Sequence, residues 1–222
     1  MTTIRGIDRR IARRHLLKHP FYRAWSNGEV EMGTLRTYAG QYFQFEQNFP
    51  RFVAAAYSRV EDVVGRRALL DNLVDEEGRD PTHPELWLRF ADALGVPRSD
   101  VIGARWNPAT RRLLSTYERH AVRGTAGSAL GALYAYESIF PAVAAEKARG
   151  LAKFYGVEDP RGLEFFRVHE SADVEHSAAE RRLIEHELAA GTREARTVER
   201  AVDATMDAWW RFLDAFCRPM AG

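Results

Sequence analysis

The sequence predicts an all-α protein, a compact bundle of seven or eight helices. Apolar residues recur at helical spacing along almost the whole chain, and no segment alternates as a strand does. Glycine and proline residues interrupt this pattern at intervals that suit helix ends. With 222 residues and 45% hydrophobic content, the chain is long enough for one well-buried core, so we expect a single domain over residues 1–222.

The first predicted helix covers residues 8–18 and begins in a basic segment. The basic residues there are Arg5, Arg9, Arg10, Arg13, Arg14 and Lys18. The formal charge of the whole chain is only +1, so no overall field favours nucleic acid or an anionic membrane as a partner. We interpret the basic cluster as the solvated face of a helix. A cleaved transit peptide is disfavoured, because the segment is poor in serine and runs directly into patterned sequence.

Seven further helices follow in order: 34–57, 61–77, 83–94, 108–122, 127–154, 161–190 and 195–217. Pro50 and Pro141 fall inside the second and sixth of the eight, so we expect kinks there. Residues 82–85 read Thr-His-Pro-Glu, a capping box with proline in the first turn. Gly78 and Gly95 stand where the two helices around this region should end.

The absence of targeting signals and the single cysteine limit the location and the chemistry that we expect. The chain has no apolar run of about 18 residues and no apolar signal core behind Met1, which predicts a cytoplasmic soluble protein. Cys217 is the single cysteine, so an internal disulfide and a thiolate-rich metal site are excluded. Because it lies among Trp209, Phe212 and Phe216, we expect a buried, unreactive thiol.

The segment HESADVEH, residues 169–176, places His169, Asp173 and His176 on one face of a helix. Offsets of four and seven residues return to within about 60° of the starting direction. Such a stripe is either solvated or buried against a charge that compensates the desolvation of the carboxylate.

Two other segments place ionisable residues beside apolar ones. In DEEGRDPTHPELW, residues 75–87, Glu76 closes one predicted helix and His83 opens the next. In LYAYESIFPAVAAEK, residues 133–147, Glu137 lies in an otherwise apolar and aromatic stretch. A carboxylate in such a stretch needs a buried cationic partner.

Together these segments supply three imidazoles and three carboxylates: Glu76, His83, Glu137, His169, Asp173 and His176. Nitrogen and oxygen donors without thiolate suit iron or manganese, and two bridged metal ions fit six donors better than one. Taken singly, each residue is more often structural than a ligand, and Glu77 is an equally acidic rival of Glu76. The Glu-x-x-His pairs of ferritin-like bundles are absent. Spacing alone therefore leaves both a metal site and a metal-free interior open.

Five segments, residues 19–30, 35–52, 75–96, 132–151 and 165–176, resemble the haem-oxygenase-like di-metal oxidases. The resemblance is strongest to the branch of the chlamydial death-domain-associating protein, and it runs in order from about residue 10 to residue 190. It implies a haem-oxygenase-like bundle without haem, as in TenA thiaminases and pyrroloquinoline-quinone synthase. It also implies that the six residues named above bind two iron ions, or one iron and one manganese. Dioxygen as co-substrate, an external reductant and a homodimer are expected from the same resemblance.

This branch is similar to self-sacrificing p-aminobenzoate synthases, which oxidise one of their own tyrosines to supply folate biosynthesis and use a lysine as amino donor. The matching residues are Tyr22 and Lys147, with Tyr136 as a further aromatic residue near the metals. From the sequence alone, Tyr22 is a core aromatic residue and Lys147 a surface residue paired with its neighbours. Lys147 is about 80° away from the direction of Glu137 on a continuous helix, so it could reach the same interior or miss it.

Several alternatives remain. An oxidase with the same ligands could act on a free amino acid or fatty acid, with many turnovers and no damage to Tyr22. A cofactorless quinone-forming relative would not need the full donor set, and TenA-like thiamine chemistry would need a cysteine nearer the site than Cys217. A protein–protein interaction module would need a large exposed apolar face, whereas we expect the aromatic residues in the core.

Overall fold

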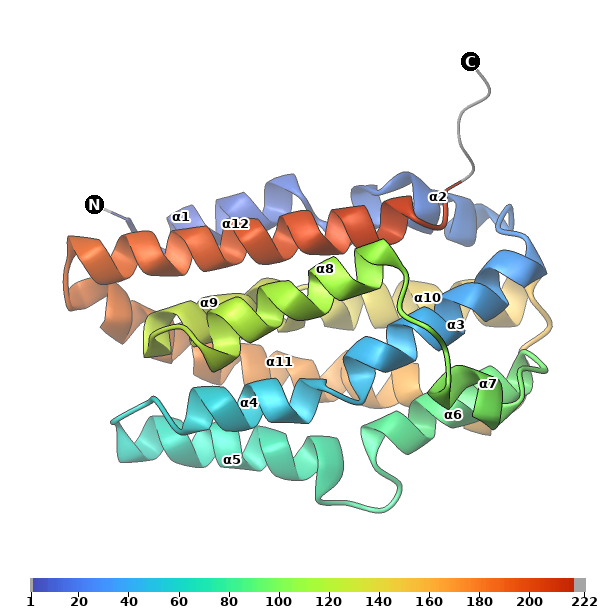
Figure 1. Ribbon diagram of the computed structural model, residues 1–222, viewed down its shortest axis with the longest axis horizontal. Helices are drawn as coiled ribbons and strands as arrows, with labels where there is room; N and C mark the ends of the chain where they lie inside the picture. Colours follow the sequence, from blue (N-terminus) through green and yellow to red (C-terminus); the bar gives the residue numbers. More distant parts are fainter. Residues whose placement is uncertain (1, 218–222) are drawn as a thin grey trace.

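The computed structural model describes residues 2–217, and within them it contains helices and turns but no strand. The predicted all-α class is therefore confirmed. Helix α11 is the longest, and it packs against α5, α6, α9, α10 and α12. In Figure 1, α1, α2 and α12 lie along one side of the bundle and α4 and α5 along the opposite side. The predicted donors come from helices that pack around α11.

Twelve α-helices occur within residues 2–217, more than the seven or eight expected. They are α1 (Ile4–Arg13), α2 (Pro20–Asn27), α3 (Met32–Glu46), α4 (Phe49–Tyr57), α5 (Val63–Glu77), α6 (His83–Ala93), α7 (Arg98–Ile102), α8 (Pro108–Tyr117), α9 (Ala126–Glu137), α10 (Phe140–Phe154), α11 (Pro160–Ala189) and α12 (Thr192–Asp214). A 3-10 turn covers Leu16–Lys18, and a π-helix covers Glu118–Val122 after α8.

The expected kinks at Pro50 and Pro141 are complete helix breaks. Each proline lies in the first turn of a new helix, α4 or α10. Proline suits that position because its missing N–H would have no intrahelical partner there, whereas in a helix interior its ring clashes with the preceding turn. Both breaks leave a carboxylate as the last helical residue, Glu46 in α3 and Glu137 in α9.

The start of the chain also differs from the prediction. The expected helix over 8–18 is divided into α1 and the 3-10 turn, and α2 was not expected at all. Nδ1 of His19 accepts a hydrogen bond from the backbone N–H of Phe21 at 3.1 Å, which caps α2, and Pro20 begins it. At the other end Gly28 adopts φ 74°, a left-handed conformation that favours glycine. Helix α2 carries Tyr22 into the core.

The ends of α5 and α6 match the prediction. Thr82 caps α6 by accepting a hydrogen bond from the backbone N–H of Glu85 at 3.3 Å, and Gly78 follows the end of α5. The cap fixes His83 as the first residue of α6, while Glu76 lies in the last turn of α5. The short loop between the helices therefore brings these two side chains to the same level of the bundle.

The basic N-terminal cluster is largely exposed, as expected, and it faces acidic residues of α12. Arg10 forms ion pairs with Glu199 and Asp203, and Arg14 with Asp207. Cys217 is half-buried rather than buried, because it lies beyond the end of α12, and burial still raises the pKa of its thiol. Within residues 2–217 we find no helix of the length and apolar character needed to cross a membrane.

Candidate metal centre

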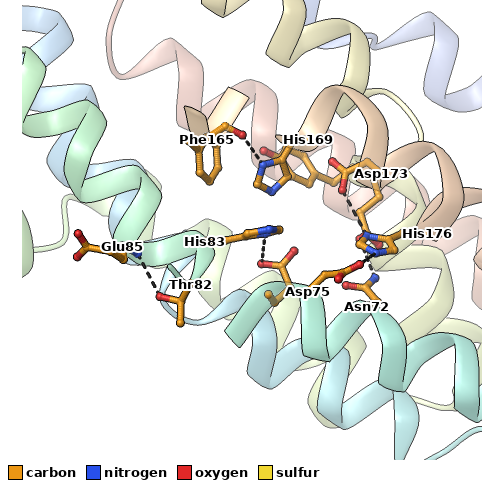
Figure 2. A network of polar contacts seen from close by, with 12 residues as sticks. Asn72, Asp75, Thr82, His83, Glu85, Phe165, His169, Asp173 and His176 are labelled. Carbon is orange, nitrogen blue, oxygen red and sulfur yellow. Dashed lines mark hydrogen bonds and ion pairs between the residues drawn. The ribbon is translucent and has the colours of Figure 1, made fainter. Parts of the chain in front are cut away.

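The six predicted donor residues meet in the interior of the bundle. Helices α5, α6, α9 and α11 supply them, and all six are buried: Glu76, His83, Glu137, His169, Asp173 and His176. Figure 2 shows the stripe of α11 facing the end of α5 and the start of α6. The sequence left open whether this stripe is solvated or buried, and the structure shows that it is buried.

The donors form two clusters. In the first donor cluster, ligand atoms of Glu46, Glu76, His83 and His169 all lie within 4.8 Å of one another. In the second donor cluster, ligand atoms of Glu137, Asp173 and His176 meet the same limit. Asp173 lies close enough to Glu76 for that carboxylate to raise its pKa, so the two clusters are neighbours. Two adjacent sets of oxygen and nitrogen donors suit two divalent cations.

Hydrogen bonds fix the orientation of two imidazoles. Nδ1 of His169 lies 2.7 Å from the carbonyl oxygen of Phe165, and since that oxygen can only accept, Nδ1 donates and Nε2 is left as the donor atom for a metal. Nε2 of His176 lies 3.1 Å from Oδ2 of Asp75, so Nε2 donates to this carboxylate. The remaining atom, Nδ1 of His176, lies 3.5 Å from Oδ1 of Asp173 and 3.6 Å from Oε1 of Glu137.

Several buried polar atoms at this site have no hydrogen-bond partner. Nδ1 of His83 and Oε2 of Glu76 lie 3.0 Å apart, yet neither has a hydrogen-bond partner. The other such atoms in the two clusters are Oε1 of Glu46, Oε2 of Glu137, Oδ2 of Asp173 and Nδ1 of His176. Leaving so many buried groups unsatisfied is costly, and lone pairs that converge without sharing protons are what a cation satisfies. The residues present therefore fit a pair of metal ions.

The pKa values of the buried groups at the site also fit a pair of metal ions. Burial raises the pKa of Asp173 to about 7 and raises that of Glu46 well above its usual range. Burial would lower the pKa of His176, but Asp173 and Glu137 outweigh it and raise the value to about 11. Burial raises the pKa of Glu137, yet contacts with Glu180 and His176 lower it overall. Without metal, the site can balance its negative charge only by binding protons.

Sequence reasoning missed two buried carboxylates, Glu46 and Glu180. Glu46 is the only acidic residue in the aromatic end of α3, the same signal that identified Glu137. Glu180 continues the stripe of α11, four residues after His176, and burial together with the charge of Glu137 raises its pKa well above the usual range. Asp75 and Asn72 were also missed, and Asn72 donates to Oε1 of Glu137 at 2.9 Å.

A chamber of aromatic rings adjoins the first donor cluster and encloses Lys147. Its rings, whose centroids lie between 4.4 and 5.6 Å from Nζ of Lys147, belong to Tyr22, Tyr38, Tyr42, Trp87, Phe140 and Phe166. Lys147 is fully buried and its Nζ has no hydrogen-bond partner. Burial lowers its pKa well below the usual range, although Glu46 opposes this shift. Lys147 is therefore an interior residue, and its neighbours Glu146 and Arg149 pair with each other.

The tyrosine hydroxyls in and beside this chamber form two pairs. Tyr22 and Tyr38 are hydrogen-bonded through hydroxyl oxygens 3.0 Å apart, and the hydroxyls of Tyr42 and Tyr136 are also in direct contact. Burial raises the pKa of all four phenols, so they are neutral. The fold thus brings together the three residues that the family resemblance indicated besides the metal donors: Tyr22, Tyr136 and Lys147.

A helical bundle whose interior gathers carboxylates and imidazoles into two neighbouring clusters is typical of proteins that bind a pair of metal ions. The chain belongs to the family described as iron-containing redox enzymes, which has the haem-oxygenase-like fold and matches residues 36–210.

Relatives of the chain carry more specific names. It is 40% identical to a 4-aminobenzoate synthase of Nitrosomonas europaea, over 94% of this chain and 88% of the relative. It is 36% identical to a 4-aminobenzoate synthase of Chlamydia muridarum, over 99% of this chain and 92% of the relative. Among solved structures, a TenA homologue from Pseudomonas syringae superposes with a TM-score of 0.79 at 17% identity, covering 96% of this chain and 91% of the other, which shows a shared fold.

Proposed function

We propose that the protein is a dioxygen-dependent di-metal oxidase that makes 4-aminobenzoate from its own Tyr22, with Lys147 as the nitrogen donor. The observation that carries this proposal is the position of Lys147, whose Nζ lies 5.5 Å from the centroid of the Tyr22 ring inside one closed chamber. The names of the relatives at 36% and 40% identity support it. The ring of tyrosine with its Cβ has the seven-carbon skeleton of 4-aminobenzoate, and the para hydroxyl marks the position that nitrogen must take.

The six predicted residues hold the metals in this proposal, and Glu46 adds a fourth donor to the first cluster. Two reduced ions, both iron or one iron and one manganese, would reduce dioxygen and so supply a strong oxidant, with an external reductant restoring them. The hydrogen bonds from His169 to Phe165 and from His176 to Asp75 hold the rings in the orientation that leaves one nitrogen of each free.

The residues of the chamber provide position and proton state. Burial disfavours the ammonium form of Lys147, which keeps a lone pair on Nζ for attack on an oxidised ring. The Tyr38 hydroxyl holds the Tyr22 hydroxyl through their hydrogen bond. The surrounding rings exclude water, so that oxidation is directed to a side chain held in place rather than to solvent.

An oxidase acting on a free amino acid or fatty acid is less well supported. Five surface cavities of the described residues are lined by none of the six predicted donors and by neither Tyr22 nor Lys147. If the substrate is the side chain of Tyr22 itself, no cavity leading from solvent to the site is needed. An interaction module as the main activity would not explain the buried donor clusters.

Mass spectrometry of the intact protein and of its peptides tests the proposal, before and after treatment with iron(II), reductant and air. We expect loss of the Tyr22 side chain together with release of 4-aminobenzoate. Tyr22→Phe should abolish the product while leaving metal content unchanged. Product formation by Tyr22→Phe, or an intact Tyr22 in protein that consumes oxygen with an added substrate, would contradict the proposal.

A further inference from the structure

The outer face of α5 carries a patch of exposed apolar side chains. Eight large apolar residues are exposed within residues 2–217, and four of them lie on this helix: Val63, Val64, Leu70 and Val74. Val64 is the most exposed of the eight, at 73%. Helix α5 packs on α4, α6 and α11 with its other face and lies at an outer edge of the bundle (Figure 1). Proteins rarely gather exposed apolar side chains on one surface unless a partner covers them.

An open cavity of about 520 Å³ continues this patch towards α6. Its walls include Leu70, Leu73 and Val74 of α5 and, beyond the end of that helix, Gly78, Thr82 and Pro84. The patch therefore has both projecting side chains, at the start of α5, and a groove that could receive such side chains, at its end.

Four exposed residues of α5 follow the spacing of a coiled-coil seam. Arg67, Leu70, Val74 and Glu77 are separated by three, four and three residues, which places them on one stripe of the helix. Arg67 and Glu77, at the ends of the stripe, have no ion-pair partner within residues 2–217. Because they lie ten residues apart, about 15 Å along the helix, they cannot pair with each other. Two unpaired charges of opposite sign thus flank two exposed apolar side chains.

This order of side chains is complementary to itself when two copies of α5 run antiparallel. With a two-fold axis near residue 72, Leu70 of one copy faces Val74 of the second, and each such contact occurs twice. In the same register Arg67 of one copy faces Glu77 of the second. In a parallel pair each of these charged residues would face its own equivalent, so like charges would repel.

The same register also uses the groove. It places Val63 and Val64 of one copy opposite residues 81 and 80 of the second, in the loop between α5 and α6. Gly78 and Thr82 of that loop line the cavity, so the most exposed valine of the chain lies beside an open apolar groove of the second copy. One arrangement therefore covers the projecting valines, fills the groove and pairs both free charges.

We propose that the outer face of α5 is the interface with a second copy of this chain, paired antiparallel about a two-fold axis near residue 72. The family resemblance predicts a homodimer but does not indicate its surface. The second copy would also cover the loop between Glu76 and His83, two donors of the first cluster. The proposal does not rest on the proposed function, because the side chain of Glu76 is buried on the other face of α5.

Sedimentation equilibrium of the metal-loaded protein tests the interface. We expect a dimer for the unaltered chain and a monomer for Leu70→Glu, which places a charge at the apolar centre of the interface. Ile102→Glu, at an exposed isoleucine of α7, is the matched control and should remain a dimer. Both variants should keep the metal content of the unaltered chain, which shows that their interior is intact. A monomeric unaltered chain at about 100 μM, or a dimer of Leu70→Glu as stable as that of the unaltered chain, would overturn the interface.

Exchanging the two charges tests the register. Arg67→Glu and Glu77→Arg, each measured alone, should raise the dissociation constant of the dimer at least about tenfold, since each replaces two attractive contacts with two repulsive ones. An equimolar mixture of the two variants should form dimers as stable as those of the unaltered chain, because each contact then joins opposite charges again. Only contacts between copies can be restored by mixing. Weak association that persists in the mixture would overturn the antiparallel register.

Discussion

His176 of α11 and Asp75 of α5 are joined by a hydrogen bond of 3.1 Å from Nε2 of the imidazole to Oδ2 of the carboxylate. Asp75 itself is not a member of either donor cluster. Its effect is to fix the tautomer of His176 and so direct Nδ1 towards Glu137 and Asp173. Figure 2 shows this contact at the side of the site away from His83.

Asp75→Asn should therefore weaken metal binding at the second donor cluster by about 10- to 100-fold, the usual effect of losing a group that orients a metal-bound imidazole. Titration of the metal-free protein with iron(II) or manganese(II) measures the effect. Glu77→Gln is the matched control, because Glu77 is the exposed acidic neighbour of Glu76 at the end of the same helix. Unchanged affinity in Asp75→Asn would show that His176 does not need this partner.

The stability of the metal-free protein should fall as pH rises. Burial raises the pKa of Asp173 to about 7, so the folded state binds this proton more tightly than the unfolded chain. Its stabilising contribution is complete below the unfolded pKa and is lost as pH rises through about 7. His176 acts in the same direction up to about pH 11, because its two carboxylate neighbours outweigh burial. His169 opposes them, since burial lowers its pKa.

Metal ions should reverse this trend, because they replace the protons. We expect the increase in Tm on anaerobic loading with iron(II) to be larger at about pH 8 than at about pH 6. Calorimetry with and without metal measures it. An increase in Tm that shrinks with rising pH would contradict a centre in which protons and metals compete for the same donors.

How far the sequence predicts this molecule depends on whether a feature is local. The stripe of α11 and the capping box at Thr82 are local patterns, and both occur as expected. The prolines were recognised as disturbing their helices, but whether a helix bends or breaks depends on what the next turn packs against. Helix α2 was missed because its cap, His19, lies in a segment with little helical periodicity.

At the site, too, the features set by local sequence were predictable and those set by packing were not. Glu137 was identified because an isolated carboxylate in an apolar stretch needs a buried partner, and the same rule applied to the end of α3 would have found Glu46. The position of Lys147 could not be derived, because α9 ends at Glu137 and α10 starts in a new direction. An angle counted along one continuous helix has no meaning across that break, so only the packed structure shows that Lys147 enters the chamber.

Glu46→Gln should release the metal of the first donor cluster more readily than that of the second. The substitution keeps the shape of the side chain but removes the charge of one of four donors that lie within 4.8 Å of one another. We expect the metal content, measured after dialysis against a weak chelator, to fall from about two ions to about one per chain. Glu170→Gln, on the exposed face of α11, should keep both ions. Loss of both ions, or of neither, would contradict an asymmetric role for Glu46.

Lys147→Met should make the protein more stable and inactive. Lys147 is fully buried, its Nζ has no hydrogen-bond partner, and burial disfavours its charged form, so an apolar side chain of similar length should raise the free energy of unfolding by about 1 to 3 kcal/mol.

Such a gain in stability with loss of activity is typical of a residue kept for chemistry rather than for packing. Denaturant unfolding measures the stability, and mass spectrometry measures the release of 4-aminobenzoate at equal metal content. Lys153→Met, on the exposed side of the same helix α10, should change stability by no more than about 0.5 kcal/mol and leave the product unaffected. If Lys147→Met instead destabilises the fold, the amine has a structural partner; if it still forms the product, the nitrogen comes from another source.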